Sequence, residues 1–99
     1  MRDHHETRRA RLVQAPKLPT RVLISSYAYA RNPDVAAEAL LQANGSCQSC
    51  GNSAPFVKRK SGEPYLEVHH LVPLAAGGED TLGNTIAICP NCHRKAHYG

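Results

Sequence analysis

Four cysteines in this 99-residue chain are spaced as metal ligands. Cys47 and Cys50 form one Cys-x-x-Cys pair, and Cys89 and Cys92 form a second. A tetrahedral zinc ion bound by four thiolates needs two such pairs brought together from distant parts of a chain. Two disulfides, or a dithiol redox site, are the alternatives. A redox site would need one pair on a βαβ scaffold, and two matched pairs therefore favour one structural zinc.

Four of the six histidines lie near the second cysteine pair: His69, His70, His93 and His97. His93 and His97 are four residues apart, so one face of a helix presents both. His69, on a strand facing that helix, is the expected third ligand. Three protein ligands with an open position are typical of a catalytic metal site. Because neighbouring strand residues point to opposite sides, His70 is left to act as a base beside the ion.

Short elements must position these side chains. The sequence predicts a helix that starts at the Asn32-Pro33-Asp34 cap and stops at Asn44-Gly45. Residues 65–69 alternate as a strand, with Tyr65, Glu67 and His69 on one face. After a loop over 73–83, a second strand is expected at 84–88 and a short terminal helix at 93–97.

The motifs together resemble the HNH (ββα-metal) endonuclease family in its zinc-knuckle form. They are Leu66-Glu67-Val68-His69-His70, Asn84, and Cys89-Pro90-Asn91-Cys92-His93 followed by His97. From about residue 31 to 99 the chain resembles the catalytic domain of methylcytosine-directed restriction endonucleases. The resemblance implies an α+β fold: a small ββα-metal domain with a four-cysteine zinc knuckle, preceded by a helix and a basic N-terminal arm.

The resemblance also implies a role for each residue of the motif. His69, His93 and His97 would bind one divalent ion (Mg²⁺, Mn²⁺, Ni²⁺ or Zn²⁺), and His70 would activate the attacking water. Asn84 would brace the loop that holds His70. Glu67 would hydrogen-bond a ligand histidine. The alternative for Glu67 is an ordinary solvent-exposed carboxylate.

The net charge of +4 lies entirely in residues 1–21, which hold six cations and two anions. We expect residues 1–20 to form a basic, flexible arm and residues 21–99 to form the nuclease domain. A basic arm suits phosphate contacts, although a solvated tail explains it as well. The candidate nucleic-acid contacts are Arg8, Arg9, Arg11, Lys58, Arg59, Lys60, Arg94 and Lys95.

The sequence therefore predicts a metal-dependent endonuclease that hydrolyses phosphodiester bonds in DNA, most simply duplex DNA. The main alternative is a non-catalytic zinc-ribbon module that binds nucleic acid; an inactive nuclease subunit and RNA as substrate are two others. No signal-peptide segment or apolar span is visible, so we expect a cytoplasmic location and no membrane partner. A chain of this size leaves little room for a specificity domain, which predicts weakly specific cutting, a homodimer or a separate specificity subunit.

Overall fold

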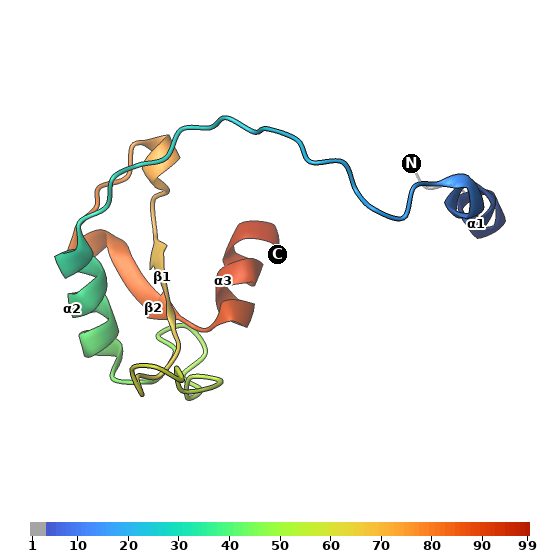
Figure 1. The fold of residues 1–99 in the computed structure, drawn as a ribbon. Coiled ribbons are helices and arrows are strands. Elements are labelled where there is room, and N and C mark those ends of the chain that lie inside the picture. Colours follow the sequence, from blue (N-terminus) through green and yellow to red (C-terminus); the bar gives the residue numbers. More distant parts are fainter. Residues whose placement is uncertain (1–3) are drawn as a thin grey trace.

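The computed structural model describes residues 4–99 (Figure 1). The helices and strands, in chain order, are α1 (His5–Gln14), α2 (Pro33–Ala43), β1 (Glu67–His70), β2 (Thr85–Ile88) and α3 (Pro90–Tyr98). Two 3-10 turns, at Leu74–Ala76 and Leu82–Asn84, lie in the loop between the strands. Over the described residues no helix is long and apolar enough to cross a bilayer.

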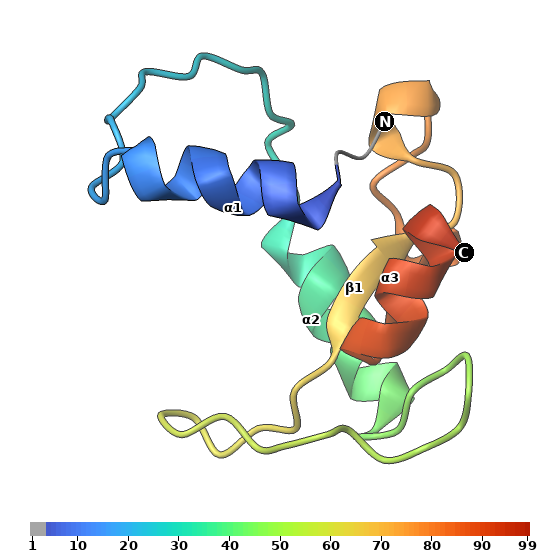
Figure 2. The ribbon, with the colours of Figure 1, turned by 90° about the vertical axis from the view of Figure 1, so that its right-hand side faces the viewer.

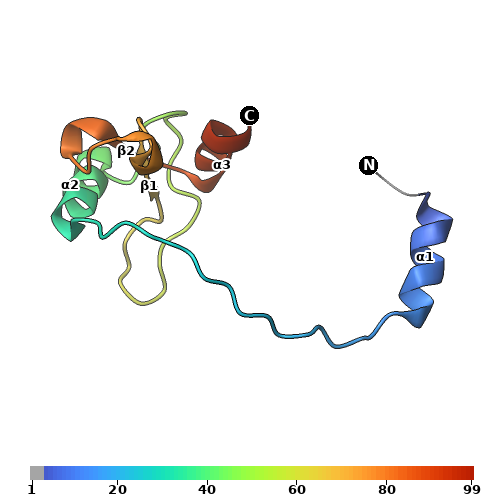
Figure 3. The ribbon, with the colours of Figure 1, turned by 90° about the horizontal axis from the view of Figure 1, so that it is seen from above.

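A two-stranded antiparallel sheet lies at the centre of the domain. Its register pairs His69 with Ile86 and His70 with Thr85. Helix α2 lies on one side of this sheet and α3 on the other (Figures 1 and 3). The ββα unit preceded by a helix confirms the predicted fold class.

Helix α2 begins and ends where its capping residues dictate. The Asn32 side chain accepts a hydrogen bond from the Asp34 N–H at 3.0 Å, and Pro33 occupies the first helical position. At the other end Asn44 takes a left-handed conformation, with φ of 50°. These bounds confirm the helix predicted from the sequence.

The two strands and the last helix differ from the prediction at their ends. Tyr65 donates its N–H to the Phe56 carbonyl at 2.9 Å, so it pairs with the preceding hairpin and β1 begins only at Glu67. Asn84 closes a 3-10 turn, so β2 begins at Thr85. Helix α3 starts earlier than predicted, because Pro90 follows directly on Cys89, its N-cap.

The buried core is small and lies between α2 and the sheet. Among the described residues its apolar members are Ala39, Ala43, Cys47, Leu66, Ala87 and Ile88. Three of these are alanines, which bury little area. A core of this size stabilises a fold weakly, and a small domain of this kind usually needs a further stabilising element.

The N-terminal part of the chain stands apart from the domain. Helix α1 buries none of its residues, and residues 15–32 run from it to α2 without regular structure (Figures 1 and 3). The radius of gyration is 19.1 Å, against about 13 Å for a compact domain of about 100 residues. The arm was predicted to be flexible, but it contains the helix α1, which a glutamate in its first turn and an arginine in its last turn favour.

Candidate functional site: two metal-ligand clusters

The four cysteines converge on one point. One sulfur from each of Cys47, Cys50, Cys89 and Cys92 lies within 4.8 Å of the others. Tetrahedral zinc–thiolate geometry places sulfurs roughly 3.8 Å apart, so a small contraction fits the set to one ion. The cysteines therefore provide the donor number and donor type of a closed structural zinc site.

Gln48 explains how the two cysteine pairs meet. Its backbone N–H donates to the Ala87 carbonyl at 3.0 Å, and its side-chain oxygen accepts the Ala87 N–H at 2.8 Å. Ala87 lies in β2, the strand that leads to Cys89. The first cysteine pair is thus hydrogen-bonded to the strand that delivers the second.

The thiols already differ in their acidity. Burial opposes ionisation of Cys47, but the N–H groups of Cys50, Cys89 and Ser49 point at its sulfur and lower its pKa to about 6. A hydrogen bond with the Cys89 sulfur and burial raise the pKa of Cys92 to about 12. One thiolate with amide donors around it is a suitable first ligand for a cation.

A second cluster consists of three histidines. His69 on β1 faces His93 and His97 on α3, with ring centroids 5.2 Å from each, and one nitrogen per ring lies within 4.8 Å of the others. His69 and His93 are half-buried and His97 is exposed. Burial, followed by the neighbouring histidines, lowers the pKa of His69, which keeps its ring neutral as a metal ligand requires.

Glu67 and Tyr65 hold one of these histidines. The Glu67 carboxylate lies 2.8 Å from His93 Nδ1 and accepts a hydrogen bond from the Tyr65 hydroxyl at 2.7 Å. The Tyr65 bond, followed by the His93 bond, lowers the pKa of Glu67. An ionised carboxylate on Nδ1 leaves Nε2 of His93 to face the other two rings.

His70 is hydrogen-bonded to a residue outside the cluster. Its Nε2 lies 2.9 Å from Asp80 Oδ1, and its side chain is 10% exposed. The hydrogen bond from His70, followed by the Asn32 N–H, lowers the pKa of Asp80. Adjacent histidines on β1 therefore have different surroundings, as strand alternation predicts.

Asn84 closes the loop between the strands. Its amide oxygen accepts the Val72 N–H at 2.9 Å, and its amide nitrogen donates to the carbonyls of Val72 at 3.0 Å and Glu79 at 2.7 Å. Gly78 lies so close to Val72 that a Cβ would sit 1.9 Å from its carbonyl oxygen. One side chain thus ties both ends of the loop that follows His70.

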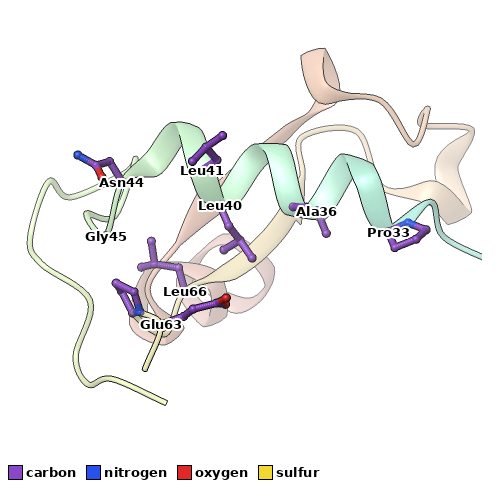
Figure 4. Close-up of a pocket in the computed structure, with 10 residues that line it drawn as sticks. Pro33, Ala36, Leu40, Leu41, Asn44, Gly45, Glu63 and Leu66 are labelled. Carbon is purple, nitrogen blue, oxygen red and sulfur yellow. The ribbon is translucent and has the colours of Figure 1, made fainter. Parts of the chain in front are cut away.

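A cavity of about 320 Å³ joins the histidines. All four line it, as do Tyr29 and Arg31 from the segment before α2. A larger cavity of about 580 Å³ lies along α2, where Leu40, Leu41 and Leu66 make it apolar (Figure 4). That groove contains no residue of either cluster, whereas the smaller cavity is lined by all three clustered histidines.

The predicted nucleic-acid contacts are spread over three elements. Arg94 and Lys95 lie on α3 between two of the clustered histidines. Lys58, Arg59 and Lys60 lie in the hairpin closed by a Val57–Pro64 bridge, at the end of the sheet opposite the loop over 71–84 (Figure 2). Arg8, Arg9 and Arg11 lie on α1, so the structure does not gather the eight into one patch.

Sequence reasoning missed several residues of the site. The contact of Tyr65 could have been predicted, because the alternation over residues 65–69 places it on the same strand face as Glu67. Asp80, Arg31 and Gln48 had no such signal, because each contacts its partner across a long stretch of chain and belongs to no periodic pattern.

Known proteins resemble the part of the chain that holds both clusters. The profile of the HNH endonuclease family matches residues 47–99, more than half of the chain. Over 70 residues the chain is 54% identical to the type IV methyl-directed restriction enzyme EcoKMcrA of Escherichia coli. The aligned stretch covers 71% of this chain and 25% of that protein. A 31-residue segment is 45% identical to anaredoxin of Nostoc and covers 31% of this chain and 41% of anaredoxin.

A solved structure supports the same relationship. The type IV phosphorothioation-dependent restriction endonuclease ScoMcrA superposes with a TM-score of 0.60 at 37% identity, over 70% of this chain and 13% of that one. The chain thus spans about a quarter of the curated restriction enzyme it matches, and a smaller share of the solved one.

Proposed function

This chain belongs to the HNH endonuclease family, and from that premise we propose that it hydrolyses phosphodiester bonds in duplex DNA. His70 serves as the general base, and His69, His93 and His97 hold one divalent ion. The family membership supports the reaction class, and the restriction enzymes among its relatives support DNA as substrate.

The observation that carries the proposal is the division of the histidines. Three offer nitrogens within 4.8 Å of one another, whereas the fourth is hydrogen-bonded elsewhere yet lines the same cavity. A metal site and a base that line one cavity are what one-metal phosphodiester hydrolysis needs.

In the proposed reaction His70 takes a proton from a water molecule, and the water oxygen forms a bond to phosphorus as the 3′-oxygen departs. His69, His93 and His97 would hold the divalent ion, which would supply positive charge for the phosphate and for the leaving oxygen. Arg31 on the wall of the cavity adds a fixed positive charge that attracts the phosphate. Glu67 fixes the His93 ring, and Asn84 fixes the loop next to His70.

The four cysteines hold a structural zinc in this proposal. Their donor set is complete without water or substrate, as in closed structural sites, whereas three histidines leave a position open. We therefore expect two ions per chain.

A cleavage assay with matched variants tests the proposal. The full chain is incubated with supercoiled plasmid in Mg²⁺, Mn²⁺, Ni²⁺ or Zn²⁺, beside His70→Ala, His93→Ala and the control His5→Ala from the arm. We expect nicking by the parent and by His5→Ala, and at least about a 100-fold loss in His70→Ala, the usual contribution of a general base. His93→Ala should also lose activity, because it removes one of the three proposed ligands of the ion. An intact plasmid under every ion, or His70→Ala cutting as fast as the parent, would contradict the assignment.

Metal content separates this function from a non-catalytic zinc-ribbon module. A binding module would hold one ion per chain, and His93→Ala would leave its metal content and its affinity for DNA unchanged. The nuclease holds two, and His93→Ala loses one of them while the zinc at the cysteines remains.

We also propose that the chain alone cuts with little sequence preference. Its matched region is a minor part of each restriction enzyme, which leaves those proteins ample further chain for reading modified DNA. Methylated and unmethylated duplexes of one sequence should then be cut at similar rates. A single defined cleavage site, or strict dependence on methylation, would refute this.

A further inference from the structure

The carboxylate of Asp80 is held at both of its oxygens. Oδ1 lies 2.9 Å from His70 Nε2, and Oδ2 accepts the backbone N–H of Asn32 at 2.6 Å. Asn32 is itself the N-cap of α2, so the second contact comes from a fixed point of the fold. Two contacts in different directions prevent the carboxylate from turning away from the histidine.

An ionised carboxylate can only accept hydrogen bonds. A neutral imidazole facing it must therefore carry its proton on the facing nitrogen, which here is Nε2. The lone pair is then on Nδ1, and within residues 4–99 no hydrogen bond engages that atom. His70 also lines the cavity that holds the three clustered histidines.

We propose that Asp80 is a positioning residue for the reaction: it fixes the tautomer and the orientation of His70, so that Nδ1 is the atom that receives the proton of water. The catalytic consequence rests on the proposed function. The Asp80–His70 pair itself does not, because it is a property of the folded protein.

The pair acts in two ways in the proposed reaction. Before the reaction, it removes the need to select one of two tautomers and one ring orientation. As the proton moves from water to Nδ1, the ring becomes an imidazolium, and the carboxylate beside Nε2 stabilises that charge without taking the proton itself. Asn32 contributes only its backbone N–H to this contact.

Nitrogen NMR of the imidazole rings tests the tautomer directly. In the zinc-loaded full chain the His70 signals are assigned by their loss in His70→Gln, and we expect the proton on Nε2. Asp80→Asn should shift it to Nδ1, because the new amide can donate to Nε2. Asp80→Glu should keep it on Nε2. Glu79→Gln, which removes the neighbouring exposed charge, is the matched control and should leave the spectrum unchanged.

Cleavage rates supply the second measurement. We expect Asp80→Asn to lose about 10²–10⁴-fold in rate at unchanged metal content, since an Asp→Asn change beside a catalytic histidine acts through the wrong tautomer. Asp80→Glu should recover most of that loss. Plasmid affinity should stay within about twofold, because the carboxylate faces the base and not the phosphate.

Several results would overturn the proposal. A parent protein with the His70 proton on Nδ1 refutes it without any variant, which covers the case in which Asp80→Asn fails to fold. Asp80→Asn that keeps the parent tautomer, or cuts as fast as Glu79→Gln, refutes it too. If the parent protein cuts no DNA, the proposed function fails, while the NMR measurement still decides whether Asp80 sets the tautomer.

Discussion

Two adjacent histidines on β1 acquire different chemistry because a strand sends neighbouring side chains to opposite faces. His69 meets two further imidazoles from α3, and His70 meets a carboxylate from the following loop. The same alternation puts Tyr65, Glu67 and His69 on one side, so a hydrogen-bonded chain leads from a phenol to a clustered histidine.

Tyr65→Phe should destabilise the fold through Glu67. The Tyr65 hydrogen bond is the largest cause of the lowered pKa of Glu67, so its loss raises that pKa. A carboxylate with a lowered folded pKa stabilises the protein above its unfolded pKa and loses that contribution as the pH falls through the folded value. The loss in free energy of unfolding is therefore expected to be the same at pH 6 and at pH 8, at about 1 kcal/mol for one hydrogen bond. Urea unfolding of the zinc-loaded protein at both pH values measures it.

The opposite result has a clear meaning. A cost that changes between pH 6 and pH 8 would show that a histidine, and not Glu67, responds to the loss of the hydroxyl. Phe56→Leu, which alters the ring stacked on Tyr65 but keeps the hydroxyl, serves as the control.

The residues that the sequence predicted are those with a local rule behind them. A spacing of three positions defines each cysteine pair, and a spacing of four positions puts His93 and His97 on one face of α3. Asp80 and Arg31 obey no such rule. Asp80 reaches Asn32 and His70 only because the loop folds back over the start of α2, and that depends on the whole domain.

At the scale of elements, the helices and strands are short and depend on their ends. The capping residues of α2 can be recognised in the sequence, and for this reason its observed ends agree with the predicted ones. The ends of the strands are harder to predict from the sequence. Tyr65 could pair with β2 or with the preceding hairpin, and the folded chain shows that it pairs with the hairpin. A helix of ten residues such as α1 lacks the long apolar periodicity that would reveal it.

Asn32→Ala should weaken α2 at its start. It removes the oxygen that accepts the Asp34 N–H, and loss of such a cap costs about 1 kcal/mol of folding free energy. Chemical unfolding of the zinc-loaded chain measures it, and Asn32→Asp, which keeps an acceptor, should lose far less. Equal stability of Asn32→Ala and the parent would mean that this cap contributes nothing.

At the scale of the whole molecule, the buried core is small, so the proposed zinc at the four cysteines should contribute much of the domain's stability. Cys47 is both a core residue and a member of the cysteine cluster. The cluster joins the turn after α2 to the start of α3.

Removal of zinc should therefore unfold the domain. Structural zinc sites in small domains contribute about 10 kcal/mol or more to folding. We expect a strong chelator, or Cys50→Ser, to abolish the dispersed amide NMR spectrum and the cooperative thermal transition. Ser49→Ala in the same turn should keep both, and a metal-free chain with a native spectrum would contradict the prediction.

Removal of residues 1–20 should leave the domain intact but change its response to salt. The described residues of that range are exposed and α1 buries none of its side chains, so the melting temperature should stay within about 2 °C, the shift produced by a few tenths of a kcal/mol. Each lost phosphate contact should lower the slope of log affinity against log salt by about 0.9. A drop in melting temperature of several degrees would show that the arm belongs to the domain.

The hairpin over 57–64 is a site where the chain can accept an inserted segment. Its ends are joined by the Val57–Pro64 bridge and by the Tyr65 N–H to the Phe56 carbonyl, and its tip carries Ser61 and Gly62 in the open. Each doubling of such a loop adds only about 0.6 kcal/mol of closure entropy. An inserted segment at the tip would leave both metal-ligand clusters undisturbed, which makes this hairpin a suitable attachment point for a reader of DNA sequence.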